Sequence, residues 1–315
     1  MQETYSNKQS TDFDDEIDLF AIFQVLLEGK WIIITITAFL SVVGVIYSLA
    51  LPNIYESKAL LVPVNPSSGI SGALRTYSDV AGLAGVNLPP EIDEGNSKKA
   101  IKKISSLSFY EENILKNIFL PNLMAVKSWN IKTNKISYDD NIYDIKTNAW
   151  TRKYSFPMQQ IPSAQESFTV FKSNHLNLSE DKKTGFITIS IKHQSPFVAK
   201  QWVELVVNEV NNFYRLKDKL QSEMAAGYLN QQMSTTDFSE IKQILAQLLQ
   251  EEIKKLALIE ANKFYVFDYI DPPAVMEEKS EPKRALICII ISLFGGVLSS
   301  LLVLIRHHFF KVKPE

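Results

Sequence analysis

Two apolar stretches near the two ends of the chain decide how it is organised. Residues 31–51 read WIIITITAFLSVVGVIYSLAL, and residues 285–305 read ALICIIISLFGGVLSSLLVLI. Each stretch is 21 residues long and contains no charged residue. As an α-helix, each would be about 31 Å long, which matches the hydrocarbon core of a bilayer at about 30 Å. The sequence therefore predicts a transmembrane helix over residues 31–51 and a second one over residues 285–305.

Each stretch has an alternative interpretation. The first could be a cleaved signal peptide, but thirty residues, many of them acidic, precede it, and they form no basic segment followed by a cleavage site of small residues. The second could be a buried helix of a soluble domain, but such a helix rarely needs to be apolar on every side for this length. We therefore expect membrane helices at both places.

The charges beside the two stretches do not decide their orientation. Close to the helix ends, four basic residues lie on the terminal sides and four on the side of the central segment, so the positive-inside rule is balanced. The central segment has more than 200 residues, and long segments cross a membrane with little regard to their charge. We expect residues 1–30, with an amphipathic helix over 12–30, and residues 306–315 in the cytoplasm, and residues 52–284 in the periplasm.

The central segment has the pattern of a mixed domain. IYESKALLVPV at residues 54–64 has the composition of a strand, and two alternating segments flank the turn DKKTG at residues 181–185, which predicts a β-hairpin. KFYVFDYI at residues 263–270 predicts a last strand that pairs with the first one. Residues 67–90 are rich in Gly, Ser, Asn and Pro and predict a loop, whereas residues 120–162 show no clear period.

Helices are predicted between these strands. Short ones are expected from Ser97 and Ser108, and SAQE from Ser163 has the pattern of a capping box. Ser195 and Pro196 predict the start of a long helix, because apolar residues recur every three or four positions to about residue 233, over about 55 Å. A second long helix is expected from near Asp237, and both have narrow apolar faces, which favours packing against each other or against neighbouring subunits.

The predicted fold class is therefore α+β. Two transmembrane helices flank a periplasmic α/β base domain, and the long helices, over about residues 196–262, form a helical extension. Within the apolar stretches, small residues recur at four-residue spacing, a pattern that lets helices approach closely but that is also common in membrane helices generally. These pairs are Gly44 with Ser48, Gly295 with Ser299, and Gly296 with Ser300.

Four segments, in their order relative to the two apolar stretches, resemble the Wzz chain-length determinants, also called class 1 polysaccharide co-polymerases. They are IDLFAIFQVLLEGKW (17–31), NIYESKALLVPV (53–64), DKKTGFITISIKHQSPFVAKQWVELVVNEVN (181–211) and YVFDYIDPPAVMEEKSEPKR (265–284). Residues 120–162 contribute little to the resemblance. The chain departs from the family where Glu281 interrupts the Ser-Pro-Lys that commonly precedes the second helix, and where serines replace the later small residues of that helix.

The resemblance implies an inner-membrane protein that forms a ring-like homo-oligomer. Such a protein sets the modal chain length of lipopolysaccharide O-antigen, which a Wzy-type polymerase makes from undecaprenyl-linked repeats. An alternative within the family is a chain-length regulator of enterobacterial common antigen, capsule or exopolysaccharide. Outside the family, the alternative is a two-span periplasmic sensor, which would need a partner for its cytoplasmic output.

The resemblance also implies which residues contact the polymerase or another copy of the chain. Pro272, Pro273, Pro282 and Lys283 match the segment that leads into the second span, and Gly295 and Gly296 match its helix-packing motif. The segment and the glycine motif are therefore the candidate functional site.

The sequence contains none of the motifs that we sought for catalysis or for a cofactor. GxxxxGK[ST], GxGxxG, HExxH and GxSxG are missing, and the lone Cys288 excludes a multi-cysteine metal site. A net charge of -2 gives no basic field for nucleic acid. An enzyme that acts on lipid-linked sugars is disfavoured because the spans contain no acid, base or metal ligand set. We expect a protein that is not an enzyme and that binds no cofactor, metal or nucleic acid.

Overall fold

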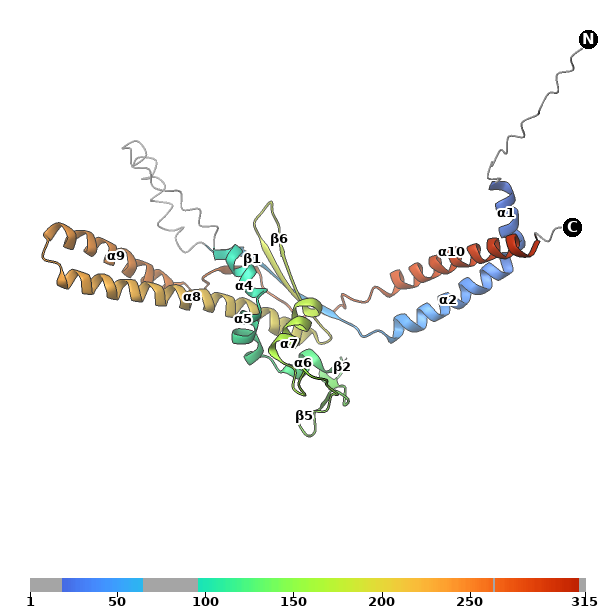
Figure 1. Ribbon diagram of the computed structural model, residues 1–315, viewed down its shortest axis with the longest axis horizontal. Coiled ribbons are helices and arrows are strands. Elements are labelled where there is room, and N and C mark those ends of the chain that lie inside the picture. The colour runs from blue at the N-terminus through green and yellow to red at the C-terminus, as the bar shows by residue number, and fades with distance from the viewer. Residues whose placement is uncertain (1–18, 65–95, 263, 312–315) are drawn as a thin grey trace, which may run out of the picture. The chain divides into compact units, whose positions relative to one another are not determined.

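The computed structural model describes residues 19–64, 96–262 and 264–311. The chain divides into two compact units, one formed by residues 53–281 and the other by residues 1–52 with 282–315 (Figure 1). The first unit contains strands and helices, and the second contains only helices among its described residues. We call them the mixed unit and the helical unit. The predicted combination of mixed helices and strands with an apolar helix at each end is confirmed.

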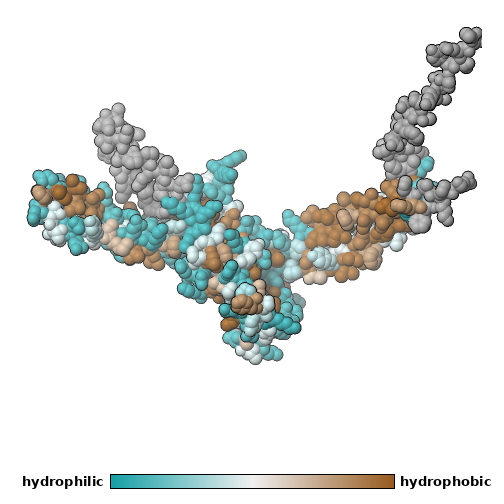
Figure 2. Space-filling model, viewed as in Figure 1, coloured by the Kyte–Doolittle hydropathy of each residue, from teal (hydrophilic) through white to brown (hydrophobic). Residues whose placement is uncertain are grey.

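The helical unit consists of α1 (Leu19–Glu28), α2 (Lys30–Ala50) and α10 (Arg284–Lys311). Helices α2 and α10 contain the two predicted spans and lie side by side, and Figure 2 shows hydrophobic residues over their surface. Both are long and apolar enough to cross a membrane, and most of their side chains are exposed, unlike those of a core helix. Of the amphipathic helix expected over residues 12–30, the part from 12 to 18 lies outside the described residues.

The mixed unit is built on a four-stranded antiparallel sheet with the order β6-β7-β1-β8. Strand β1 pairs with β7 from Tyr55 opposite His193 to Leu61 opposite Ile187. The predicted first strand, the predicted hairpin and the pairing of the first and last strands are all confirmed. The strands are β1 (Tyr55–Pro63), β6 (Leu176–Glu180), β7 (Ile187–His193) and β8 (Phe267–Asp271).

Helix α8 (Pro196–Thr235) packs on β1 and β7 and forms the core with them. Its buried residues recur with helical spacing, as in Val203, Val206 and Val210, and they meet the alternate buried residues of the strands, such as Leu61 and Ile189. The helix is 40 residues long, or about 60 Å, and ends close to the predicted end at residue 233. Its buried residues end at Ser222, so the last third of the helix is not needed to cover the sheet.

A buried asparagine of α8 sets the place where the last strand begins. Asn211 Oδ1 accepts hydrogen bonds from the backbone N–H groups of Tyr265, Val266 and Phe267, at 3.2, 2.7 and 2.9 Å. Its Nδ2 donates to the Phe267 carbonyl at 3.0 Å. The expected strand over residues 263–270 therefore begins later, at Phe267, because these N–H groups are bonded to a side chain and not to a neighbouring strand.

Helix α9 (Ser239–Ala261) returns along α8. Its N-cap is Phe238, so the prediction that the helix begins near Asp237 is right to within two residues, although the aspartate does not cap it. Lys219 and Glu260 form an ion pair between the two helices, and Ile259 is fully buried. The two long helices thus pack against each other, as the narrow apolar faces predicted.

A set of short helices completes the core of the mixed unit. The capping box predicted at Ser163 is half present, because Ser163 Oγ accepts from the Glu166 N–H at 3.2 Å, but the Glu166 carboxylate pairs with Arg152. The short helical elements are α4 (Asn96–Ile104), α5 (Leu107–Phe109), η1 (Tyr110–Ile114), η2 (Leu115–Asn117), α6 (Leu120–Met124), α7 (Ala164–Val170) and η3 (Phe171–His175).

The region without a clear period forms two hairpins after α6. They are β2 (Val126–Asn130) with β3 (Lys135–Tyr138), and β4 (Tyr143–Asp144) with β5 (Ala149–Trp150). The loop predicted over residues 67–90 lies outside the described residues.

Two histidines, buried His193 and half-buried His175, pack against Trp202 near the start of α8. His193 is 2% exposed, and its ring centroid lies 5.2 Å from that of Trp202 and 5.9 Å from that of His175. His193 Nδ1 accepts a hydrogen bond from the Ser195 N–H at 2.8 Å. Its Nε2 lies 2.9 Å from the Asn122 carbonyl oxygen, and in a neutral ring the Nε2–H donates a hydrogen bond to that oxygen. The Ser195 side chain makes no capping bond, so the histidine holds the N-cap residue instead.

We expect the mixed unit to lose stability in mild acid. Burial lowers the pKa of His193 from its ordinary value of 6.5 to about 4, so below pH 6.5 the unfolded chain takes up a proton that the folded chain does not. Stability is therefore fully present above pH 6.5 and falls as the pH drops through this window. Between about pH 7.5 and about pH 5 the loss is about 2 kcal/mol.

Urea unfolding of the detergent-solubilised chain, followed by tryptophan fluorescence, measures this loss. A His193→Gln chain should be less stable at neutral pH but show a shallower pH dependence. Some dependence should remain, because burial also lowers the pKa of His175. An unchanged pH dependence in the variant would contradict the assignment to His193.

Candidate functional site: the helical pair, the proline-rich segment and the long helices

Small residues let α2 and α10 approach closely. A Cβ atom added at Gly44 would lie 3.0 Å from Ile291, and one added at Gly295 would lie 3.1 Å from Leu40. Both distances are shorter than most real Cβ contacts, so these positions favour glycine. The Ser41 and Ser292 hydroxyls form a hydrogen bond of 2.8 Å between the helices. The predicted close approach is thus present within one chain.

The two candidate glycines of α10 have different surroundings. Gly295 is buried against α2, whereas a Cβ at Gly296 would meet nothing within 4 Å. Ser300, one turn later, is half-buried and donates its hydroxyl to the Gly296 carbonyl at 2.8 Å. Gly295 therefore lies in the contact between α2 and α10, whereas a side chain at Gly296 would enter open space.

The candidate prolines are divided between the two units. In the mixed unit, Pro272 is exposed and Pro273 is buried at the end of β8. In the helical unit, Pro282 and Lys283 precede α10, where the Pro282 carbonyl accepts from the Arg284 N–H at 3.0 Å. The proline-rich segment is thus not one cluster of side chains: its first two prolines belong to the sheet and its last two residues to the start of the helix.

The segment between these prolines runs beside the start of β1. Ser57 Oγ donates to the Ala274 carbonyl at 2.8 Å, and Ile54 pairs with Glu281 as an antiparallel bridge. The Glu281 carboxylate lies 2.5 Å from Lys192 Nζ on β7. The glutamate by which the chain departs from the family pattern therefore has a defined role, since it ties the end of the segment to the sheet.

An apolar stripe follows the outer part of α8 and α9. Leu216, Leu220, Met224 and Tyr228 recur every four residues on α8 and are all more than half exposed. On α9, Ile241, Ile244, Leu248 and Ile253 are exposed as well. Figure 2 shows hydrophobic residues on this part of α8 and α9. Large apolar side chains that stay exposed along a helix are typical of a protein–protein contact. We call these eight residues the α8–α9 stripe.

Sequence reasoning missed two residues that position these surfaces. Asn211 lies within the apolar series Val207, Val210 and Tyr214, and a polar residue at a buried position of that series was the signal that could have found it. Lys192 alternates outward on β7, where nothing in the sequence indicates its partner Glu281.

The perturbed ionisable groups of the mixed unit are explained by packing. Arg152 and Glu166 pair, and this pairing raises the pKa of the arginine and lowers that of the glutamate. Burial raises the pKa of Tyr110 to about 12. Among the described residues, no group of three or more His, Cys, Asp or Glu side chains is placed to hold a metal ion.

Comparison with known proteins gives one family match. The family described as Wzz, chain length determinant protein, matches residues 15–120. This range includes α1, α2 and β1. Among curated proteins, none matches the chain.

Two solved structures are similar at low identity. A full-length bacterial polysaccharide co-polymerase is 14% identical, with 96% of this chain and 100% of that chain covered and a TM-score of 0.40. A fragment of WzzB, a polysaccharide co-polymerase from Salmonella Typhimurium, is 14% identical, with 73% of this chain and 100% of that chain covered and a TM-score of 0.30. The match over residues 15–120 confirms, for that part of the chain, the resemblance to the Wzz chain length determinants found in the sequence.

Proposed function

We propose that this protein is an inner-membrane co-polymerase that sets the modal chain length of lipopolysaccharide O-antigen made by a Wzy-type polymerase. The observation that carries the proposal is the Wzz match over residues 15–120, on a chain whose mixed unit lies in sequence between two apolar helices. Members of this family are chain-length regulators in polysaccharide synthesis. The choice of O-antigen and of a Wzy-type partner is the finer part of the proposal.

In this proposal both termini lie in the cytoplasm and the mixed unit lies in the periplasm. The protein performs no chemistry and binds no cofactor, and it acts by holding copies of itself and the polymerase in a fixed arrangement. The α8–α9 stripe packs neighbouring copies of a ring-like homo-oligomer, because eight exposed apolar side chains are costly to leave in water. Gly296 and the segment from Pro272 to Lys283 contact the polymerase or another copy, and the growing undecaprenyl-linked glycan is a further partner.

Deletion of the gene should change the length of O-antigen. We expect a gel of lipopolysaccharide from the deletion strain to lose its modal cluster of long bands and to regain it when the gene is restored. The control is restoration with a chain that lacks residues 285–315, which has no second span. An unchanged ladder would remove the O-antigen assignment and direct the same experiment to capsule, exopolysaccharide and enterobacterial common antigen.

A charge on the stripe should separate the copies. We expect Leu220→Lys to weaken association at least about tenfold, because burying one leucine side chain contributes about 1.5–3 kcal/mol. Light scattering of the detergent-solubilised chain measures the oligomer. Gln221→Lys is the matched control, since Gln221 is also exposed on α8 but lies outside the stripe. Unfolding should be unaffected in both variants, and an intact oligomer in Leu220→Lys would show that the stripe is not the contact.

The two glycines of α10 should respond differently to a large side chain. Gly295→Leu should destabilise the helical pair by about 1–3 kcal/mol, because the new side chain overlaps Leu40. Gly296→Leu should leave the pair intact but shorten or broaden the O-antigen distribution, because it fills the open position.

A cross-link between the helices separates these effects. The parent for this test is a Cys288→Ser chain with Ser41→Cys and Ser292→Cys, which replace two hydroxyls that are 2.8 Å apart. A disulfide should form between the two new cysteines in this parent and in its Gly296→Leu variant. Less disulfide should form in its Gly295→Leu variant. Equal cross-linking and equal O-antigen profiles in both glycine variants would contradict the division of roles.

A further inference from the structure

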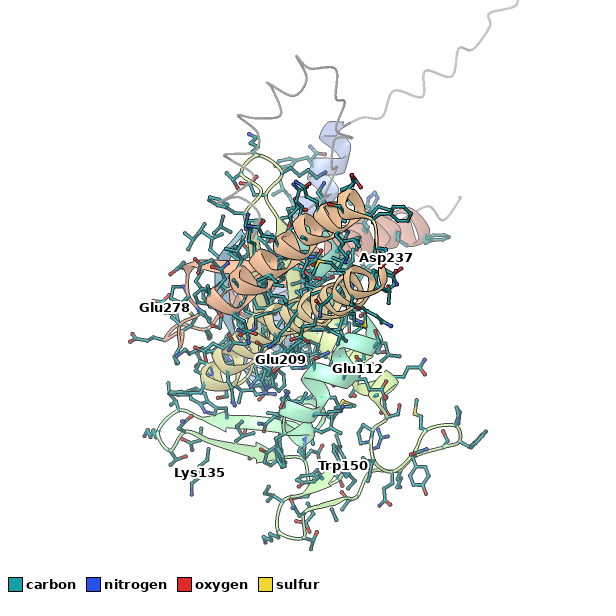
Figure 3. All side chains as sticks on the ribbon, turned by 90° about the vertical axis from the view of Figure 1, so that its left-hand side faces the viewer. Glu112, Lys135, Trp150, Glu209, Asp237 and Glu278 are labelled. Atoms are coloured by element: carbon teal, nitrogen blue, oxygen red, sulfur yellow. The ribbon has the colours of Figure 1, made fainter. Side chains whose placement is uncertain are left out.

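The β2–β3 hairpin presents an apolar and basic tip. Ile131, in the turn between the strands, is 67% exposed, and residues 125–138 contain three lysines and no acidic residue. Lys127, Lys132 and Lys135 are exposed, and none of them has an ion pair with the described part of the chain. Figure 3 shows Lys135 on this hairpin, apart from the long helices.

The turn is held in a defined conformation. Asn130 Oδ1 accepts from the N–H groups of Lys132 and Thr133, at 2.9 and 3.2 Å. The indole N–H of Trp129 donates to Asn134 Oδ1 at 2.9 Å, and Asn134 has a positive φ of 49°. Asparagine tolerates this left-handed conformation better than most residues. These hydrogen bonds hold the turn in a conformation that leaves Ile131 exposed. Because the turn is already ordered, the entropic cost of binding a surface there is lower.

The turn end of the hairpin is fixed against Tyr55, a residue that follows the first apolar helix closely in the sequence. The ring of Trp129 contacts that of Tyr55 edge to face, with the centroids 5.4 Å apart, and lies 6.4 Å from that of Phe197. Tyr55 follows Leu51, the C-cap of α2, by four residues. Four extended residues span at most about 14 Å, so a bilayer crossed by α2 ends within this distance of Tyr55.

We propose that the tip of the β2–β3 hairpin docks on the surface of the bilayer that holds the chain, with Ile131 among the headgroups and the three lysines against anionic phospholipid. Each lysine near an anionic surface strengthens binding by about fivefold. The proposal rests on the membrane anchoring in the proposed function. Docking would limit rotation of the mixed unit about the short connection that follows α2.

The chain contains a matched control. The β4–β5 hairpin also exposes an isoleucine in its turn, Ile145, which is 50% exposed. Asp144 and Lys146 flank it with opposite charges, so this tip has no net attraction to an anionic surface. The two hairpins thus differ in charge and in their link to Tyr55, while both expose one isoleucine.

The test is a fluorophore that reports contact with lipid. The full chain with Cys288→Ser and either Ile131→Cys or Ile145→Cys is labelled with an environment-sensitive dye. It is then reconstituted in phosphatidylcholine nanodiscs with or without phosphatidylglycerol, and quenching by lipids with a nitroxide at the headgroup is measured. The unaltered chain, labelled at Cys288 within α10 and quenched by acyl-chain nitroxides, tests the anchoring separately.

With phosphatidylglycerol present, we expect quenching at position 131 to exceed that at position 145 by at least about threefold. Quenching at position 131 should fall when Lys127, Lys132 and Lys135 are changed to Gln, and also when the salt concentration is raised. Equal quenching at 131 and 145, with Cys288 quenched, would overturn the docking and leave the anchoring intact. A blue shift at 131 without nitroxide quenching would place the tip against protein and would also overturn it. An unquenched Cys288 would overturn the anchoring itself, and the docking with it.

Discussion

The carboxamide of Asn211 is the constraint on which the mixed unit depends. It accepts from three successive backbone N–H groups and donates to one carbonyl, at the place where the chain leaves α9 and begins β8. A buried N–H without a partner costs about 1–3 kcal/mol, so the three groups could not be buried there without this side chain. Because β8 pairs only with β1 among the described strands, the asparagine of α8 also sets the position of the last strand on the sheet.

The position of β8 determines how the chain enters and leaves the mixed unit. With β8 beside β1, the following segment turns back along the start of β1, where Ile54 and Glu281 form a bridge and Lys192 pairs with the Glu281 carboxylate. The first and last residues of the unit therefore lie together. In the proposed function, where the unit lies between two membrane helices, both of its ends must return to the same bilayer surface. Sheet pairing, and not the helices alone, meets that need here.

Elements whose apolar residues recur at a regular spacing could be predicted from the sequence. The two apolar helices, β1, the β6–β7 hairpin and α8 each have such a spacing, which periodicity detects. The hairpins of residues 126–150 could not be predicted, because their short strands bury few residues and their turns depend on side-chain bonds such as that from Trp129 to Asn134. The site was predictable only by residue type. Gly295 and Gly296 look alike in the sequence, and their different surroundings follow from which face of α10 meets α2.

The distribution of burial along α8 separates the parts of the helix that fold the unit from those that are free to bind. Up to Ser222 the helix buries residues against the sheet or beside α9, whereas beyond it the exposed apolar stripe continues without sheet to cover. A helix that served only the core could end near that residue. The continuation of about 13 residues, paired with α9, adds exposed apolar surface and little to the core. The proposed contacts between copies would give this surface a function, because they would remove it from water.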